Sequence, residues 1–189
     1  MAATTAPPSD VAADCIEYLR QKEAWAFDPS SPDARRAFVP IHVLQRYFDK
    51  PRIERLLSYF HRSAADWRWI QSDYLAVFAV LITIDKGAYI THFTWHDHLA
   101  DDRLPSISAS DLPPDCKSFF PQFAAARWRF CAQTLRKGRL NEKRFPPETI
   151  IPITSYRPLK EGPDSSTYKV KIHPDYNQLA DKVRMLKPC

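Results

Sequence analysis

The sequence predicts a mainly α fold, a compact domain of several short helices around a central helix, with a small β-hairpin at the C-terminus. Apolar residues recur every three or four positions through most of the chain, which is typical of amphipathic helices. Seventeen prolines stand against three glycines and fall mostly between the apolar runs, where they start helices or stiffen connections. With 189 residues, 44% of them hydrophobic, the chain can bury one core and a small appendage.

The N-terminal part of the chain is predicted to form short helices with tight joints. Residues 9–25 place apolar side chains on one helical face, so they form the first helix. Pro32, Pro40 and Pro51 mark three further helix starts, because the first turn of a helix does not need the N–H that proline lacks.

The central helix is expected over residues 64–85, which are apolar on nearly every face. For this reason we place residues 74–84 in the middle of the core. Polar residues interrupt the run, and its apolar part is shorter than the roughly 20 residues that a membrane span requires. A turn of helix at residues 88–95 and a surface connection at residues 105–114 follow.

A last, long helix is predicted from Phe119 to Arg136 and Lys137, with Gly138 as its C-terminal stop. The hydrophobic period then changes to two in residues 168–172, as on a half-buried strand. These changes divide the sequence into three parts: a disordered tail at residues 1–9, a helical domain at residues 10–144, and the hairpin with its tail at residues 145–189.

The net charge of +5 and the pI near 9.0 raise the question of a nucleic-acid partner. Basic residues are spread along most of the chain, except in residues 127–144, which hold seven Lys or Arg against one Glu. The end of a solvated helix explains this cluster as well as phosphate binding or a nuclear localisation patch does. The sequence therefore disfavours nucleic acid as a partner and gives no indication of a membrane.

Targeting and cysteine patterns point to the cytosol or nucleus. Residues 1–8 lack the basic start and the apolar run of a signal peptide. Cys15, Cys116, Cys131 and Cys189 form no Cys-x-x-Cys pair, and nothing indicates an oxidising compartment. We expect free, mostly buried thiols.

His92, His96 and His98 form the one cluster that resembles a metal site. His92 and His96 share a helical face if that segment is helical, as metal ligands can. No Glu follows His92 as in the zinc-protease pattern, so we expect capping or surface histidines and no metal. Asp101 and Asp102 are adjacent and point in different directions, so we expect a solvated turn there and no acid–base pair.

Near the C-terminus, a strand-like run at residues 150–153 precedes a loop at residues 159–166 and the alternating residues 167–176. This arrangement resembles the first hairpin of a protein kinase, in which two strands flank a Gly-x-Gly-x-x-Gly loop. On the kinase pattern Lys160, Gly162 and Ser165 occupy the glycine positions. Further runs resemble a group of filamentous-fungal proteins that carry a helical N-terminal region before a serine/threonine protein kinase domain: residues 77–82, 101–105, 119–123, 127–132, 147–152 and 168–174.

The resemblance covers about residues 40 to 180 and implies a vestigial ATP loop at Gly162, with Lys187 in the place of the ATP-binding lysine. The partner glutamate, the His-Arg-Asp catalytic loop and the Asp-Phe-Gly metal site of kinases have no counterpart in this sequence. Without them phosphoryl transfer has no means of positioning the nucleophile or neutralising charge. The resemblance thus implies that this chain is not an enzyme and holds no cofactor.

The preferred interpretation is a non-catalytic helical interaction or regulatory module that binds a protein and lacks the kinase catalytic domain. Trp67, Trp69, Trp95 and Trp128 are candidate anchors, although we expect most of these tryptophans to lie in the core. Two alternatives remain open. One is an N-terminal fragment of a serine/threonine protein kinase with residual ATP binding, and the other is a basic nucleic-acid-binding domain.

We expect Mg-ATP to leave the unfolding temperature of the chain unchanged up to millimolar concentration, because a ligand raises that temperature only by binding the native state. Thermal unfolding at increasing Mg-ATP concentration checks this expectation. A saturable rise that disappears when Gly162 is replaced by a bulky residue contradicts it and supports the kinase-fragment alternative.

Overall fold

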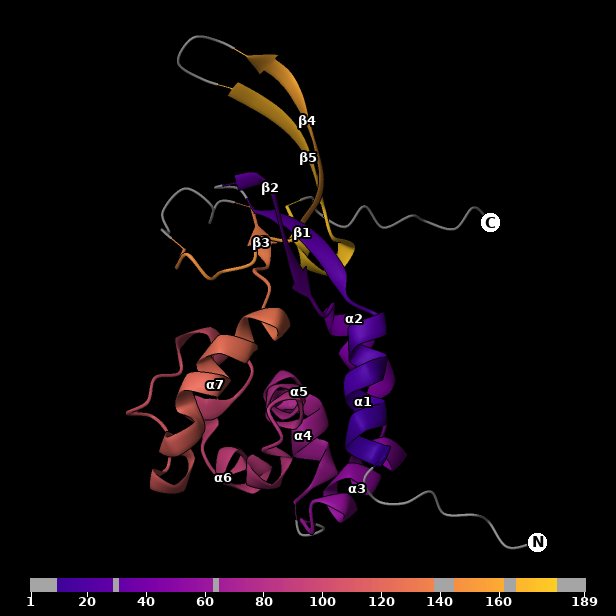
Figure 1. Ribbon diagram of the computed structural model, residues 1–189, viewed down its shortest axis with the longest axis vertical. Helices are drawn as coiled ribbons and strands as arrows, with labels where there is room; N and C mark the ends of the chain where they lie inside the picture. Colours follow the sequence, from indigo (N-terminus) through magenta and orange to yellow (C-terminus); the bar gives the residue numbers. More distant parts are fainter. Residues whose placement is uncertain (1–9, 29–30, 63–64, 138–144, 162–165, 180–189) are drawn as a thin grey trace, which may run out of the picture. The chain divides into compact units, whose positions relative to one another are not determined.

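The computed structural model describes residues 10–28, 31–62, 65–137, 145–161 and 166–179 (Figure 1). The chain divides into two compact units. The first consists of Met1–Glu23 and Phe38–Cys131, and the second of Ala24–Ala37 and Ala132–Cys189. The sequence placed the boundary between residues 144 and 145, whereas the structure divides after Cys131 and adds an N-terminal segment to the second unit. The expected tail at residues 1–9 lies outside the described residues.

The first unit is helical, and the expectation of a mainly α fold is confirmed. Short 3₁₀ turns lie between or after its α-helices at Gly87–Tyr89, Asp97–Leu99, Leu104–Ser106, Pro114–Phe119 and Arg127–Phe130. The α-helices of this unit are α1 Asp10–Gln21, α2 Ile41–Tyr47, α3 Lys50–Tyr59, α4 Trp67–Asp73, α5 Leu75–Thr83, α6 Ile90–Thr94 and α7 Phe120–Ala126.

Two of the three proline-marked helix starts are confirmed. Pro40 immediately precedes α2, and Pro51 lies in the first turn of α3, where Asp49 caps the helix by accepting from the Arg52 amide at 3.0 Å. The start predicted at Pro32 is wrong, since this residue lies in strand β2, Ser31–Phe38. Within the described residues β2 pairs with β1 alone and is therefore an edge strand, and edge strands tolerate proline.

The predicted central helix is present in its apolar part but is interrupted. Tyr74 has φ −131° and ψ 24°, outside the helical range, and separates α4 from α5. All residues from Leu75 to Ile82 are buried, and α5 packs against α1, α2, α4, α6 and α7. The expectation that residues 74–84 form the middle of the core is therefore correct, although Thr83 and Ile84 are only half-buried.

Asp101 caps the N-terminus of the buried helix α5 from a distant part of the sequence. Its two carboxylate oxygens accept from the Ala76 and Val77 amides, each at 2.9 Å, and its own amide donates to the Asp73 carbonyl at 2.8 Å. The first amides of a helix have no partner within it, so a buried helix start needs such an acceptor. The predicted solvated turn is thus wrong for Asp101, while the Asp102 side chain is 75% exposed.

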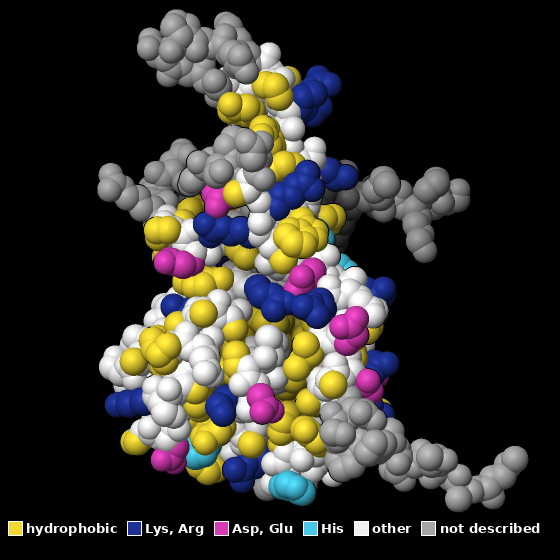
Figure 2. Space-filling model, in the orientation of Figure 1, with side chains coloured by type: hydrophobic (Ala, Val, Ile, Leu, Met, Phe, Trp, Pro, Cys, Tyr) yellow, Lys and Arg dark blue, Asp and Glu magenta, His cyan; other side chains and the backbone are white. Residues whose placement is uncertain are grey.

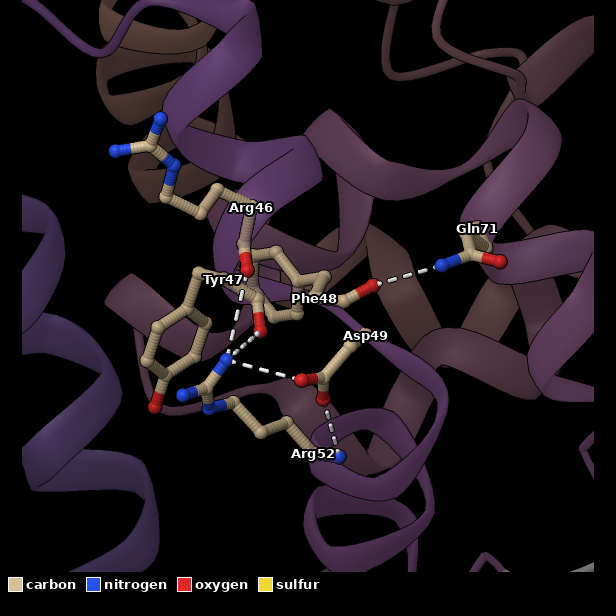
Figure 3. Close-up of polar contacts among 6 residues, drawn as sticks. All are labelled: Arg46, Tyr47, Phe48, Asp49, Arg52 and Gln71. Atoms are coloured by element: carbon tan, nitrogen blue, oxygen red, sulfur yellow. Dashed lines mark hydrogen bonds and ion pairs between the residues drawn. The ribbon is translucent and has the colours of Figure 1, made fainter.

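Arg52 ties the corner between α2 and α3 (Figure 3). Its Nη1 donates to the Tyr47 carbonyl at 3.2 Å and forms an ion pair with Asp49 at 3.1 Å, and its guanidinium lies over the Tyr47 ring. Gln71 of α4 donates to the Phe48 carbonyl at 3.1 Å. Side chains from α3 and α4 thereby satisfy carbonyls that the end of α2 leaves unpaired.

The second unit is built from hairpins. Strand β1, Ala24–Asp28, pairs with β2, and β4, Ile153–Glu161, pairs antiparallel with β5, Ser166–Ile172. The short strands β3, Leu135–Arg136, and β6, Asn177–Gln178, run parallel, and a 3₁₀ turn at Pro174–Tyr176 precedes β6. The predicted small β-hairpin is therefore present, as β4 and β5. Strand β1 was missed because its alternation of exposed Trp25 and buried Ala26 is too short to stand out.

The predicted long helix after Phe119 is shorter than expected. It ends in the 3₁₀ turn Arg127–Phe130, and Leu135 belongs to β3. The helical spacing of the apolar residues continues past this point, but the Gln133 amide pairs with the Ile150 carbonyl at 2.9 Å, which takes the backbone out of a helix. The expected stop at Gly138 lies outside the described residues.

Among the described residues, no helix combines the length and the apolar character needed to traverse a bilayer.

Replacing Asp101 by Ala is expected to destabilise the chain at pH 7 by about 1–3 kcal/mol, because two buried amides at the start of α5 lose their acceptor. Urea unfolding followed by circular dichroism measures the change. Asp102→Ala is the matched control, and an equal effect of the two substitutions contradicts the capping role.

The pH dependence of stability is a second readout of the same carboxyl. Burial raises the pKa of Asp101 to about 6, despite the amides that donate to it. A carboxyl with a higher pKa in the folded than in the unfolded chain binds its proton more tightly when folded. The extra stability that this proton adds is therefore present below about pH 4 and is lost as the pH rises to about 6, while the ionised carboxylate still accepts from the Ala76 and Val77 amides at pH 7. Asp101→Asn should lack this part of the pH dependence.

Candidate functional site

A row of ring contacts leads from the core of the first unit to its surface. The ring centroids of Phe119 and Tyr89 lie 5.0 Å apart, those of Tyr89 and His92 5.8 Å, and those of His92 and Trp95 5.9 Å. Phe119 is buried, Tyr89 and His92 are half-buried, and Trp95 is 73% exposed. We call these four residues the aromatic ladder.

The local sequence explains why the aromatic ladder stands on one face. Tyr89, His92 and Trp95 are three residues apart along the 3₁₀ turn Gly87–Tyr89 and α6, so their side chains follow one another on the same side. Gly87 permits this start, because a Cβ at that position would lie 2.2 Å from a ring carbon of Phe60. Ile90 and Phe93 take the opposite, buried face of α6.

An open cavity begins two residues after Trp95. Its volume is about 470 Å³, and we call it the acidic hollow. Within its lining, Arg103 Nε lies 3.6 Å from a carboxylate oxygen of Asp102. The hollow is lined by Asp97, His98, Asp102, Arg103, Ser106, Ile107 and Asp111.

The acidic hollow is held by hydrogen bonds across its loop. The hydroxyl and the amide of Ser108 donate to Asp111 at 2.7 and 2.8 Å, and they lower the pKa of this carboxyl below its usual value. His98 Nε2 lies 3.2 Å from the Asp111 carbonyl. Leu104 and Ile107 are buried beneath the loop. The contacts with Ser108 therefore keep the Asp111 carboxyl ionised at neutral pH and hold its loop in place.

The three histidines predicted as weak metal candidates, His92, His96 and His98, do not form one group. His92 contacts Tyr89 and Trp95, whereas His96 and His98 contact each other, with ring centroids 5.3 Å apart. No group of three His, Cys, Asp or Glu in the described part of the chain is arranged to hold a metal ion. Gly162 and Lys187, the residues of the predicted vestigial ATP loop, lie outside the described residues.

The expectation that most tryptophans lie in the core is wrong. Trp69 is 54% exposed and Trp95 73%, while Trp67 and Trp128 are half-buried. In α4 the core position belongs to Ile70, and a neighbouring residue is rotated by about 100° around the helix axis, which takes Trp69 out of the core. The exposed anchors that the sequence named are thus Trp69 and Trp95.

The buried cysteines are poor nucleophiles. Cys15, Cys116 and Cys131 are free, as expected, and Cys189 lies outside the described residues. Burial raises the pKa of Cys15 and of Cys131 to about 12 and that of Cys116 to about 11. Because the thiolate is the reactive form, these side chains serve the core.

The sequence did not predict the acidic hollow. It predicted a solvated turn at Asp101 and Asp102 and a surface connection at residues 105–114, but not that these segments line one cavity. Asp97 and Asp111 are 14 positions apart, and only the return of the loop brings them to one cavity. Comparison of the chain with family models, with curated proteins and with solved structures found no match.

In a chain with Cys189→Ser, we expect the remaining thiols to react with a disulfide reagent at pH 8 at least about a hundredfold more slowly than a free cysteine, because so little thiolate is present. Absorbance of the released product measures the rate. In denaturant all three should react at once. Rapid reaction of any native thiol would show that its site is open.

Proposed function

We propose that this chain is a non-catalytic interaction module whose helical unit binds a protein partner through Trp95 and the acidic hollow. The observation that carries the proposal is the 73% exposure of Trp95 at the end of a row of contacting rings. Covering a large exposed aromatic side chain with a partner removes much apolar area from water, which favours binding. The proposed location is the cytosol or nucleus, which the three free thiols support.

The aromatic ladder has the properties of a binding hot spot. Tryptophan and tyrosine supply much contact area with few rotatable bonds, so little conformational entropy is lost on binding. Contact with His92 further restricts the Trp95 ring before a partner arrives. Such preorganisation favours affinity because less ordering remains to be done in the complex.

The chemistry of the surface suggests the chemistry of its partner. Trp95 offers an apolar and π-rich face, and the acidic hollow that starts at Asp97 offers carboxylates. A peptide segment with an apolar side chain close to a Lys or Arg matches both, since complementary charge fixes orientation and aromatic contact supplies affinity. We therefore propose a basic and apolar segment of another protein as the partner.

The kinase-fragment alternative remains a prediction. Strands β4 and β5 form an antiparallel hairpin, and such hairpins are common in unrelated folds, so their presence does not favour this alternative. Residual nucleotide binding depends on Gly162 and Lys187, and the Mg-ATP titration described above decides it.

Selection of peptides from a displayed random library on the purified chain tests the proposed function. We expect enriched peptides to combine an apolar residue with Lys or Arg. Trp95→Ala should weaken their affinity by about thirtyfold, as expected for a hot-spot residue worth about 2 kcal/mol. Isothermal titration calorimetry with a selected peptide measures this loss.

The matched control is Trp69→Ala, which removes a second exposed tryptophan from the same unit. It should leave peptide affinity unchanged. Asp97→Asn should weaken binding most at low salt, because screening already reduces the charge term at high salt. Peptides that bind the Trp95→Ala chain as tightly as the unaltered chain would refute the proposed surface.

A further inference from the structure

The positive charge of the chain belongs to the second unit. This unit carries 14 Lys or Arg against 8 Asp or Glu, a formal charge of +6, whereas the first carries 13 against 14, a charge of −1. The linear sequence conceals this partition because the second unit is assembled from two separate segments. In the sequence analysis, the even spread of basic residues argued against a nucleic-acid partner. In the folded chain the excess of basic residues lies in the second unit, so that argument no longer holds.

Three of these cations stand on one face of the β4–β5 hairpin. Arg157 lies directly opposite Lys169, and Ser155 lies opposite Lys171 in the same register. Residues two apart on a strand point to the same side, and so do directly opposed residues. Arg157, Lys169 and Lys171 therefore share a face, which we call the basic face, and all three are exposed.

The basic face is not neutralised within the described residues. No ion pair joins Arg157, Lys169 or Lys171 to a described carboxylate. Like charges directly opposite each other across two strands destabilise the pair. A hairpin that keeps Arg157 against Lys169 thus presents concentrated positive charge to its surroundings.

On the other face of the hairpin, Tyr156 packs against β1. The Tyr156 ring packs edge to face against the Phe27 ring of β1, with ring centroids 4.8 Å apart. The centroids of the Tyr156 and Tyr168 rings lie 5.6 Å apart. Because Tyr156 and Arg157 are neighbours on β4, they point to opposite sides. Contact with β1 therefore leaves the basic face directed away from that strand. Figure 2 shows hydrophobic and basic side chains on different sides of this hairpin.

We propose that the basic face of the β4–β5 hairpin binds the phosphate backbone of a nucleic-acid duplex without reading its sequence. A two-stranded β-ribbon has the width that the major groove of a duplex admits. Lys169 and Lys171 are separated by two residues, about 6.6–6.8 Å along a strand, so they can address successive phosphates. Phosphate contacts give affinity but carry no sequence information.

The observations favour a duplex over an acidic protein. Protein interfaces draw most of their affinity from buried aromatic and apolar anchors. The exposed aromatic Tyr168 and apolar Val170 lie on the face opposite to the cations. The basic face itself offers only charge and the Ser155 hydroxyl, which suits a polyanion whose binding is dominated by counterion release.

Fluorescence anisotropy of a short labelled DNA duplex of mixed sequence tests the proposal with the full chain at about 50 to 200 mM salt. The chain with Arg157→Gln, Lys169→Gln and Lys171→Gln should bind at least tenfold more weakly at the lowest salt. The slope of log affinity against log salt should decrease in magnitude by about 2–3, since each phosphate contact contributes about 0.9.

A control of equal charge separates the hairpin from net charge. Arg20→Gln, Arg55→Gln and Lys117→Gln remove three exposed cations of the first unit and should leave the slope unchanged. Thermal unfolding verifies that both triple variants remain folded. Trp95→Ala should bind duplex as the unaltered chain does, which separates this proposal from the peptide site.

Results of three kinds would overturn the proposal. The first is equal weakening by the two triple variants, which would indicate net charge alone. The second is equal competition by polyglutamate, which would indicate an acidic protein. The third is absence of duplex binding at the lowest salt, or tighter binding of a single strand of the same length.

Discussion

The fold of the first unit depends on placing an apolar helix in the centre without leaving its polar ends unsatisfied. Helix α5 is buried along eight consecutive residues, so water cannot reach the amides at its start. Asp101 supplies the acceptors from a loop that also forms part of the surface around the acidic hollow. The hydrogen bonds of Asp101 to the start of α5 consequently position the loop that continues into the acidic hollow.

Patterns in the sequence were sufficient for the helical class, the core segment and most helix starts, because prolines and apolar spacing act locally. They failed where a distant partner decides the local structure. Tyr74 interrupts a run with continuous helical periodicity, and the Gln133 amide donates to the distant Ile150 carbonyl where the sequence predicts a helix. Strand pairing of this kind is a property of the tertiary structure and leaves little mark on a single stretch of sequence.

The candidate surfaces were predictable in part. Trp95 was named as an anchor from its residue type, but its exposure depends on how α6 packs, which residue type does not reveal. Histidine spacing suggested a metal site, whereas the side chains of His92 and His96 make separate ring contacts. The basic face could not be predicted without the register of β4 against β5. Arg157, Lys169 and Lys171 share one face only because Arg157 pairs with Lys169 across the two strands.

The second unit takes its strands β1 and β2 from residues that precede most of the helical unit in the chain. A single cut therefore cannot separate the two units as complete pieces: truncation after Cys131 leaves residues 24–37 without β4, and removal of residues 1–37 takes α1 away from the core. Folding of either unit has to bring together segments from both sides of the other. Because each unit is assembled from two separate segments, a gene fusion or a terminal deletion cannot transfer either complete unit to another protein. In evolution the two units are therefore expected to be inherited together.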